Sequence, residues 1–204
     1  MAQVKKAHVR DAILKSADRL FKRKGYVSAT TAQIAKGAKV SESNLYVYFR
    51  SKFSILMALY EPWLRARIHT LEERLESETD TARRLKLILN ALWREIPSAD
   101  NGFTNNLMQA LSTVSRREGY RPNLLHWVEG RIESLIMASL PPSRRAELAN
   151  RGLTHILMMA QDGFALNFHL TPSDAGLDRL TDLACSLIAG SSARTKSKTR
   201  LTQY

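Results

Sequence analysis

The chain has 204 residues, enough to bury a core and to form one or two domains. Hydrophobic residues make up 44% of the sequence and charged residues 25%, with a formal net charge of +12, which excludes a disordered or membrane-spanning chain. No apolar run approaches the roughly 20 residues of a spanning helix, and the N-terminus has no apolar signal-peptide core. We therefore expect a cytoplasmic protein without a membrane partner.

Positive charge is concentrated in the first quarter of the chain. Residues 1–55 hold 12 Lys or Arg and three Asp or Glu, a net charge of +9. Residues 56–190 hold 15 basic and 16 acidic side chains, while residues 191–204 hold four basic and no acidic ones. This partition favours a polyanionic partner for the first quarter, because Lys and Arg that neutralise phosphates release counterions.

The first predicted helix runs from about Lys5 to Lys24 and ends at Gly25, a residue type suited to a helix C-terminus. We expect its basic residues at the extreme N-terminus to reach phosphate and the others to face solvent. The alternative is that all of them form a solvated face. Its apolar residues recur with helical spacing, which predicts one buried stripe: Val9, Ile13, Ala17, Leu20 and Phe21.

The stretch from Thr30 to Lys52 predicts two short helices joined by a tight turn, then the start of a longer helix. Thr30 with Gln33 three residues later forms a predicted capping box, and Gly37 marks the end of this helix. Ser41 is a predicted N-cap of the next one. Such a pair of helices is typical of a helix-turn-helix.

The second of these short helices has two distinct faces. Leu45 and Phe49 lie four residues apart and are expected to face inward. A short helix anchored on one side and exposed on the other has the dimensions to lie in a DNA major groove. Its outer face combines short polar groups, aromatic rings and one apolar side chain: Glu42, Ser43, Asn44, Tyr46, Val47 and Tyr48.

A longer helix is predicted from an N-cap at Ser51 to about Ser77, and Pro62 interrupts it. We considered two interpretations: Pro62 breaks the helix and forms a hinge, or Pro62 begins a second helix. Further helices are expected at about 81–96, 103–117, 122–140, 143–170 and 174–189. No segment alternates with the period of a strand, so the predicted fold class is all-α, with about nine helices.

The last two predicted helices are rich in apolar residues. The helix at 143–170 is apolar on more than one face, and Gly163 in its middle suggests close approach of another backbone. The final helix repeats leucines on one stripe. We expect the pair to bury these faces across a two-fold axis, as a four-helix homodimer interface. Simple interior packing is the alternative. Cys185, the single cysteine, is expected to be a small buried residue in the final helix.

The segment from Ile13 to Leu56 resembles the TetR family of bacterial transcriptional regulators. It contains the LF…GY close of the first helix, the TTxxIA opening of the second and the LYxYFxSK sequence after the third. Two residues depart from the family pattern: Lys39 stands where the turn glycine is usual, and Ser43 where the recognition helix often has glycine. Lys39 is therefore expected near left-handed geometry, where it can approach a phosphate.

The resemblance implies roles for individual residues. Thr30 or Thr31, Tyr48 and Lys52 are implied to hold phosphates. For Glu42 we weigh acceptance from a cytosine amino group against a simple role in the first helical turn. The alternative for Tyr46 and Tyr48 is a place in the core. The candidates for base edges are Ser41, Ser43, Asn44, Tyr46 and Val47, with Val47 suited to a thymine methyl group.

The resemblance further implies a helix-turn-helix domain at 1–52, a helical effector-binding and dimerisation domain at 53–190, and a basic tail at 191–204 that we expect to be disordered. The implied function is a homodimeric repressor released from a pseudo-palindromic double-stranded operator when a largely apolar small molecule binds. Candidate effector contacts, for which plain core packing is the alternative, are Trp63, Trp93, Asn105, Met108, Gln109, Trp127, Met159, Gln161 and Phe164.

Two other function classes were weighed. A non-enzymatic small-molecule sensor or carrier with only non-specific DNA binding requires a basic head that does not read sequence. An enzyme is not expected, because the five histidines and one cysteine form no recognised catalytic or metal-binding pattern. We accordingly expect no catalytic residue, no metal and no cofactor.

Overall fold

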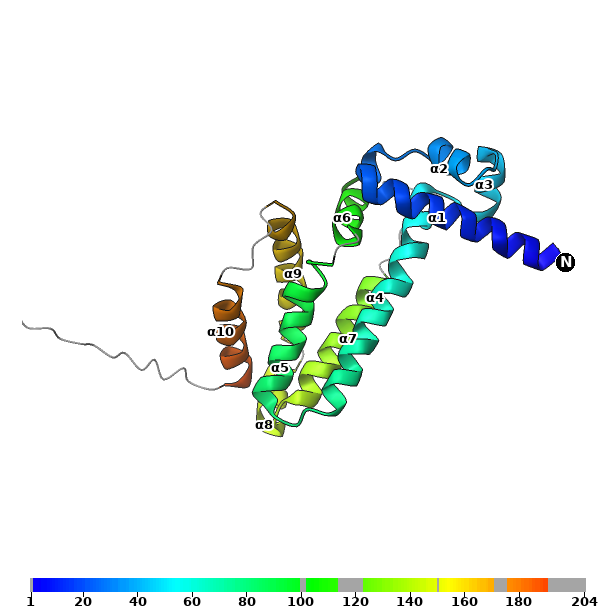
Figure 1. Cartoon of the computed structure of the whole chain (residues 1–204). Coiled ribbons are helices and arrows are strands. Elements are labelled where there is room, and N and C mark those ends of the chain that lie inside the picture. Colours follow the sequence, from blue (N-terminus) through cyan, green and yellow to red (C-terminus); the bar gives the residue numbers. More distant parts are fainter. Residues whose placement is uncertain (1, 100–101, 114–122, 150, 171–175, 191–204) are drawn as a thin grey trace, which may run out of the picture.

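The computed structural model describes residues 2–99, 102–113, 123–149, 151–170 and 176–190. These residues form ten α-helices and one π-helical turn, without a strand among them, which confirms the all-α prediction (Figure 1). None of these helices is both long and apolar enough to cross a bilayer. The elements are α1 (Ala2–Ser28), α2 (Thr31–Gly37), α3 (Glu42–Tyr48), α4 (Lys52–Glu76), α5 (Thr81–Asn90), the π-helical turn η1 (Ala91–Glu95), α6 (Phe103–Thr113), α7 (Asn123–Ser139), α8 (Pro142–Leu148), α9 (Leu153–Leu170) and α10 (Leu177–Ala189).

Helices α1, α2 and α3 form a small unit, hereafter the head, at one end of the molecule (Figure 1). The predicted stripe of α1 supplies its core, and Val9 is the one member that is only partly buried. Ile34 of α2 is fully buried against this stripe, as is Leu45 of α3, whose burial was predicted. Gly25 departs from helical geometry with φ +74°, so it interrupts α1 before a last turn that ends at Ser28. The apolar pattern alone was sufficient to assign this core.

Helix α4 leaves the head and runs down the body without a break. Both interpretations of Pro62 are wrong, because the helix continues from Lys52 to Glu76 with Pro62 inside it. Proline removes one backbone donor from a helix interior, but buried Leu64, Ile68 and Leu71 on the following turns keep this segment packed. The local sequence correctly indicated that a backbone hydrogen bond is lost at Pro62. Burial of the following turns against the body decided that the helix continues.

The body consists of α4, α5, α7, α9 and α10 packed around one apolar core, with α6 between the body and α1. The π-helical turn η1 extends α5 and carries buried Trp93, whose indole N–H donates to the Leu157 carbonyl of α9 at 3.2 Å. Insertion of one residue into a helix re-aims the side chains that follow it. Here the turn directs Trp93 to α9, a placement that periodicity along α5 does not predict.

The prediction of a single helix at 143–170 is wrong, because the structure has two helices in this range. Helix α8 ends at Leu148, Ala149 leaves helical geometry, and Gly152 has φ +69°, a conformation that favours glycine. Helix α9 begins at Leu153 in a new direction. The connection between the helices predicted at 143–170 and 174–189, and the basic tail at 191–204, lie outside the described residues.

Cys185 is buried in α10, as predicted, and we expect it to be a poor nucleophile. Burial, with a smaller contribution from Asp182, raises the pKa of its thiol to about 11. At pH 8 a thiol of this pKa is about 100-fold less ionised than one with an ordinary pKa, so a thiol reagent should label the native chain at least 100-fold more slowly than the urea-denatured chain. The native rate should still rise above pH 10, and equal rates in the two states would contradict this assignment.

Candidate nucleic-acid interface

Local hydrogen bonds set the ends of α2 and α3. The Gln33 N–H donates to Thr30 Oγ1 at 3.2 Å and the Thr30 N–H donates to Gln33 Oε1 at 3.4 Å, which confirms the predicted capping box. Ser41 caps α3 in the same manner by accepting from the Asn44 N–H at 3.1 Å. Each cap satisfies backbone donors that the first helical turn leaves without partners. The remaining free N–H groups at both helix starts are suited to an anion.

Lys39 takes the left-handed conformation that the sequence predicts, with φ +58°. It is the one non-glycine residue with positive φ in the part of the chain that the structure describes. The conformation costs roughly 1 kcal/mol for a residue with a Cβ. Its exposed side chain lies in the turn between α2 and α3. Lys39 therefore adds a small backbone strain to the turn, and it places an ammonium group on the exposed surface between α2 and α3, where glycine would have no side chain.

The outer face of α3 exposes residues that usually avoid water. The side chains of Val47 and Tyr46 are 76% and 48% exposed, whereas Leu45 on the inner face of the same helix is fully buried. The alternative that Tyr46 belongs to the core is therefore wrong. Tyr48 is intermediate, because part of its ring packs against the head core. A short helix that is anchored through one side and presents apolar and aromatic groups on the other has the form of a docking element.

A chain of hydrogen bonds joins the start of α2 to this face. Thr31 Oγ1 donates to Glu42 Oε1, and the Tyr46 hydroxyl donates to Thr31 Oγ1 at 3.4 Å. Glu42 is thus positioned in the first turn of α3, beside the start of α2. Ser43 lies nearby, with its Oγ 3.0 Å from the Ser41 Oγ. The structure brings these predicted residues together on one surface of α2 and α3.

Lys52 is placed differently from the free ammonium group that the resemblance implies. Its Nζ donates to the carbonyl oxygens of Tyr26 and Ala29, each at 2.8 Å, and to that of Val27 at 3.4 Å. The same ammonium lies 4.3 Å from the centroid of the Tyr26 ring, and burial lowers the pKa of Lys52. The side chain therefore holds the end of α1 and the α1–α2 connection against the start of α4.

Replacing Lys52 with methionine should destabilise the full chain by about 1 to 3 kcal/mol, because part-buried carbonyls lose their donor. Thermal and urea denaturation followed by circular dichroism measure the loss. The matched control is Lys36→Met on exposed α2, which should stay within about 0.5 kcal/mol of the parent chain. Unchanged stability of Lys52→Met together with weaker DNA binding would instead assign Lys52 to phosphate contact alone.

The residues predicted to hold an effector divide into separate groups in the body. Trp63 of α4 packs against Phe103 of α6, with ring centroids 5.4 Å apart. Trp93 of η1 packs against Phe164 of α9, with centroids 5.0 Å apart, and Gln161 is buried on the same helix as Phe164. Trp63, Trp93 and Phe164 of the predicted set thus take part in aromatic pairs between helices, and the partner Phe103 was not predicted.

Other members of the set have different surroundings. Met159 is 63% exposed on α9, so it does not line an interior pocket of one chain. The indole of Trp127 is covered by the Arg65 guanidinium, 4.1 Å from its centroid. Asn105 and Met108 are partly buried on α6. Periodicity and residue type do not distinguish these positions from true pocket residues, because they do not specify what packs on each face.

Gln109 contacts the head instead of an interior pocket. Its Oε1 accepts from the Val27 N–H at 3.3 Å, and its side chain lies where a Cβ on Gly25 would be, 3.0 Å from Oε1. Beside it, buried Asn106 donates to the Phe21 carbonyl at 3.4 Å and to the Gly102 carbonyl at 2.9 Å. Asn106 was missed by the sequence reasoning. The sequence feature that could have identified Asn106 is its position, since it places an amide within the apolar stripe of a predicted helix.

Comparison with known proteins agrees with this geometry. Residues 13–59 match the model for bacterial regulatory proteins of the tetR family. The chain is 38% identical over 96 residues to the nucleoid occlusion factor SlmA of Aliivibrio fischeri, a match that spans 45% of this chain and 47% of that relative, about half its length. It is 23% identical over 184 residues to the nicotine-responsive transcriptional repressor HdnoR of Paenarthrobacter nicotinovorans, covering 88% of this chain and 91% of that protein.

A solved structure supports the same fold over the whole described chain. The fatty acid degradation regulator FadR from Bacillus halodurans superposes with a TM-score of 0.66 at 19% identity, covering 91% of this chain and 96% of that one. At this identity the likeness concerns the fold alone. Residues 13–59 therefore match the model for bacterial regulatory proteins of the tetR family, and the all-helical chain as a whole shares the fold of the FadR structure.

Proposed function

We propose that this protein is a homodimeric, ligand-responsive DNA-binding transcriptional repressor. The observation that carries the proposal is the outer face of α3, where Tyr46 and Val47 are exposed although Leu45 on the same helix is fully buried. This face belongs to the region with a net charge of +9. An exposed apolar and aromatic surface within a strongly basic unit suits the major groove, where a valine can contact a thymine methyl group and phosphates lie on both sides.

The proposed DNA contacts follow the two helix starts and the outer face of α3. The start of α2, with Thr30 and Thr31, is suited to a phosphate, as is Lys39 in the turn. Lys52 is proposed to act mainly by fixing the head on α4, and Tyr48 contributes a partly exposed hydroxyl. The proposed base-reading residues are Ser41, Ser43, Asn44, Tyr46 and Val47, with Glu42 holding Thr31 in place.

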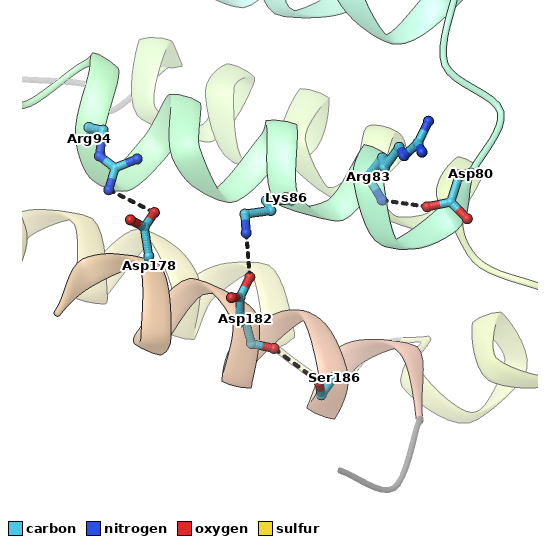
Figure 2. Close-up of polar contacts among 7 residues, drawn as sticks. All are labelled: Asp80, Arg83, Lys86, Arg94, Asp178, Asp182 and Ser186. Atoms are coloured by element: carbon cyan, nitrogen blue, oxygen red, sulfur yellow. Dashed lines mark hydrogen bonds and ion pairs between the residues drawn. The ribbon is translucent and has the colours of Figure 1, made fainter. Parts of the chain in front are cut away.

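Helix α10 supports a two-fold assembly through its outer face. Its inner face is buried and is flanked by two ion pairs to α5 and η1, Lys86–Asp182 at 2.6 Å and Arg94–Asp178 at 2.9 Å (Figure 2). Solvent-exposed ion pairs contribute little stability, but these fix which face of α10 turns outward. The hydrogen bond with Asp182 also raises the pKa of Lys86.

The outward faces of α9 and α10 are apolar. A solvated helix face rarely carries this many large apolar groups, so we propose that a second copy covers them. A Cβ on Gly163 of α9 would meet no atom within 4 Å beyond the neighbouring part of its own helix, in the described residues, which suits close approach by the partner helix. The exposed apolar residues of this surface, hereafter the C-terminal apolar face, are Ile156, Met159, Leu166, Leu180, Leu183 and Leu187.

A small molecule is proposed to bind in the body beside the two aromatic pairs. Trp93 and Phe164 supply apolar area, and the side-chain oxygens of Thr104 and Thr154 are buried without a hydrogen-bond partner in the described residues. A ligand with an apolar skeleton and a few polar atoms would satisfy both features. HdnoR, which matches most of the chain, is named for its response to nicotine, a small organic molecule.

Helix α6 offers a route from the body to the head. Phe103 at its start packs on Trp63, while Gln109 and Asn106 bond to the backbone of α1. An effector that shifts α6 would therefore change the position of α1 and the separation of two heads in a dimer. Repression is relieved only if the effector binds the two arrangements with different affinity.

The direct experiment is a gel shift of the full chain on DNA from upstream of its own gene, with random-sequence duplex as competitor. A shift that resists competition at moderate salt supports the proposal. Binding that competes equally with random DNA would favour the alternative, a sensor or carrier with non-specific DNA binding only. A thermal-shift screen of small molecules then identifies the effector, because a ligand of the native state raises the melting temperature.

A further inference from the structure

The head has a second basic surface away from the outer face of α3. A groove of about 660 Å³ lies between α1 and α2, hereafter the α1–α2 groove. Its floor contains Ser16, whose hydroxyl donates to the Ile34 carbonyl at 2.9 Å, and nearly buried Leu20. The two helices approach so closely at Gly37 that a Cβ there would lie 2.2 Å from the Ser16 Oγ. The groove is therefore a fixed feature of the helix pair.

The rim of this groove is cationic. Arg19, Arg23 and Lys24 of α1 and Lys36 of α2 line it, and no acidic residue does. All four side chains are exposed, and none of the four forms an ion pair with a carboxylate within the described residues. The contrast lies on the same helix, where Lys22 is paired with Asp18 at 2.9 Å. The four basic side chains along the groove are thus all without a carboxylate partner among the described residues.

The groove meets the proposed phosphate contact at one end. Gln33 lines it and also caps α2 through its hydrogen bond with Thr30. A duplex whose backbone contacts the start of α2 has phosphates on the neighbouring turn as its nearest anions. Those phosphates carry one charge per about 1.7 Å of duplex axis, so a group of cations without carboxylate partners next to the first contact is complementary to them in charge.

We propose that the α1–α2 groove binds backbone phosphates of the duplex outside the half-site. The proposal rests on DNA binding by the head, and it assigns to Arg19, Arg23, Lys24 and Lys36 a role beyond a solvated surface. Phosphate contacts add affinity without reading sequence. The groove therefore makes operator affinity depend on the length of flanking DNA, and strengthens the search along non-specific DNA.

The test compares two duplexes and two charge-matched variants of the full chain. One duplex ends at the two half-sites of a sequence selected from a random library, and the other adds about one helical turn, roughly ten base pairs, on each side. The groove variant is Arg19→Gln with Arg23→Gln. The control is Lys15→Gln with Lys22→Gln, which removes the same charge from exposed positions of the same helix outside the groove.

On the long duplex, the groove variant should bind at least tenfold more weakly than the control at roughly 0.1 M salt, and its salt slope should fall by about 3.6, the value for two lost phosphates at each of the two heads. On the short duplex the two variants should bind equally. Equal affinities on the long duplex, or an equal deficit on both duplexes, would overturn the proposal. Failure of the parent chain to select any sequence would instead contradict the proposed function.

Discussion

The double variant Asn44→Ala with Tyr46→Ala should lose about 2 to 4 kcal/mol of operator binding, roughly a 30- to 1,000-fold weaker Kd. Both residues lie on α3, with Tyr46 half exposed on its outer face, and neither fills the head core. The fold should therefore remain, because Leu45 and the Ser41 cap, which bonds to the backbone of residue 44, are unchanged. Fluorescence anisotropy on labelled operator at constant salt measures the change.

Two controls separate base reading from general damage. Tyr46→Phe keeps the ring and removes only the hydroxyl that bonds to Thr31, so its loss should be the smaller part of the Tyr46→Ala effect. The salt slope of the double variant should match that of the parent chain, since its phosphate contacts are retained. An equal loss of affinity for random-sequence DNA would show that α3 does not carry sequence readout.

Replacing Leu183 and Leu187 with glutamate should convert the proposed dimer into a monomer. These side chains are 52% and 64% exposed on the C-terminal apolar face, and in a two-fold interface each substitution places like charges near one another. Such juxtaposition costs several kcal/mol, so dimerisation should weaken by about 1,000-fold or more. Sedimentation velocity should then report a species near the chain mass of 23.0 kDa.

The control for this variant is Val27→Glu. Val27 is 58% exposed, a similar fraction, but it lies in the head. It should leave the dimer intact, and the backbone N–H that donates to Gln109 is unchanged by the substitution. Circular dichroism should show that both variants remain helical. A Leu183→Glu, Leu187→Glu chain that sediments as the parent does would place the assembly, if any, on another surface.

The local sequence determined much of the head. The capping pairs at Thr30 and Ser41 depend on residues three apart, and the buried stripe of α1 depends on helical spacing, so both could be predicted without tertiary information. The left-handed Lys39 also followed, because the turn needs that conformation whichever residue occupies it. The match of residues 13–59 to the tetR family model rests on the same short-range pattern.

Only the tertiary structure decided which polar side chains have hydrogen-bond partners within the protein and are therefore not free to bind a ligand. Lys52 is a basic residue beside a DNA-binding motif in the sequence, yet three carbonyls from the end of α1 and the α1–α2 connection hold its ammonium group. In the sequence Gln109 resembles an amide that lines a pocket. In the structure α6 packs on α1, and the Gln109 Oε1 accepts a hydrogen bond from the Val27 N–H. These partners lie 23 to 26 and 82 residues away, and spacing along one helix does not encode them.

The course of the long helices was likewise decided by packing. Pro62 predicted an interruption, but the burial of Leu64 and Ile68 keeps α4 continuous. The apolar run at 143–170 predicted one helix, but Gly152 adopts positive φ and separates α8 from α9. Hydrophobic periodicity determines that a segment is helical and which stripe is buried. The direction in which each helix continues, and which side chains remain free to bind, depend on free energies of packing between segments that are distant in the sequence.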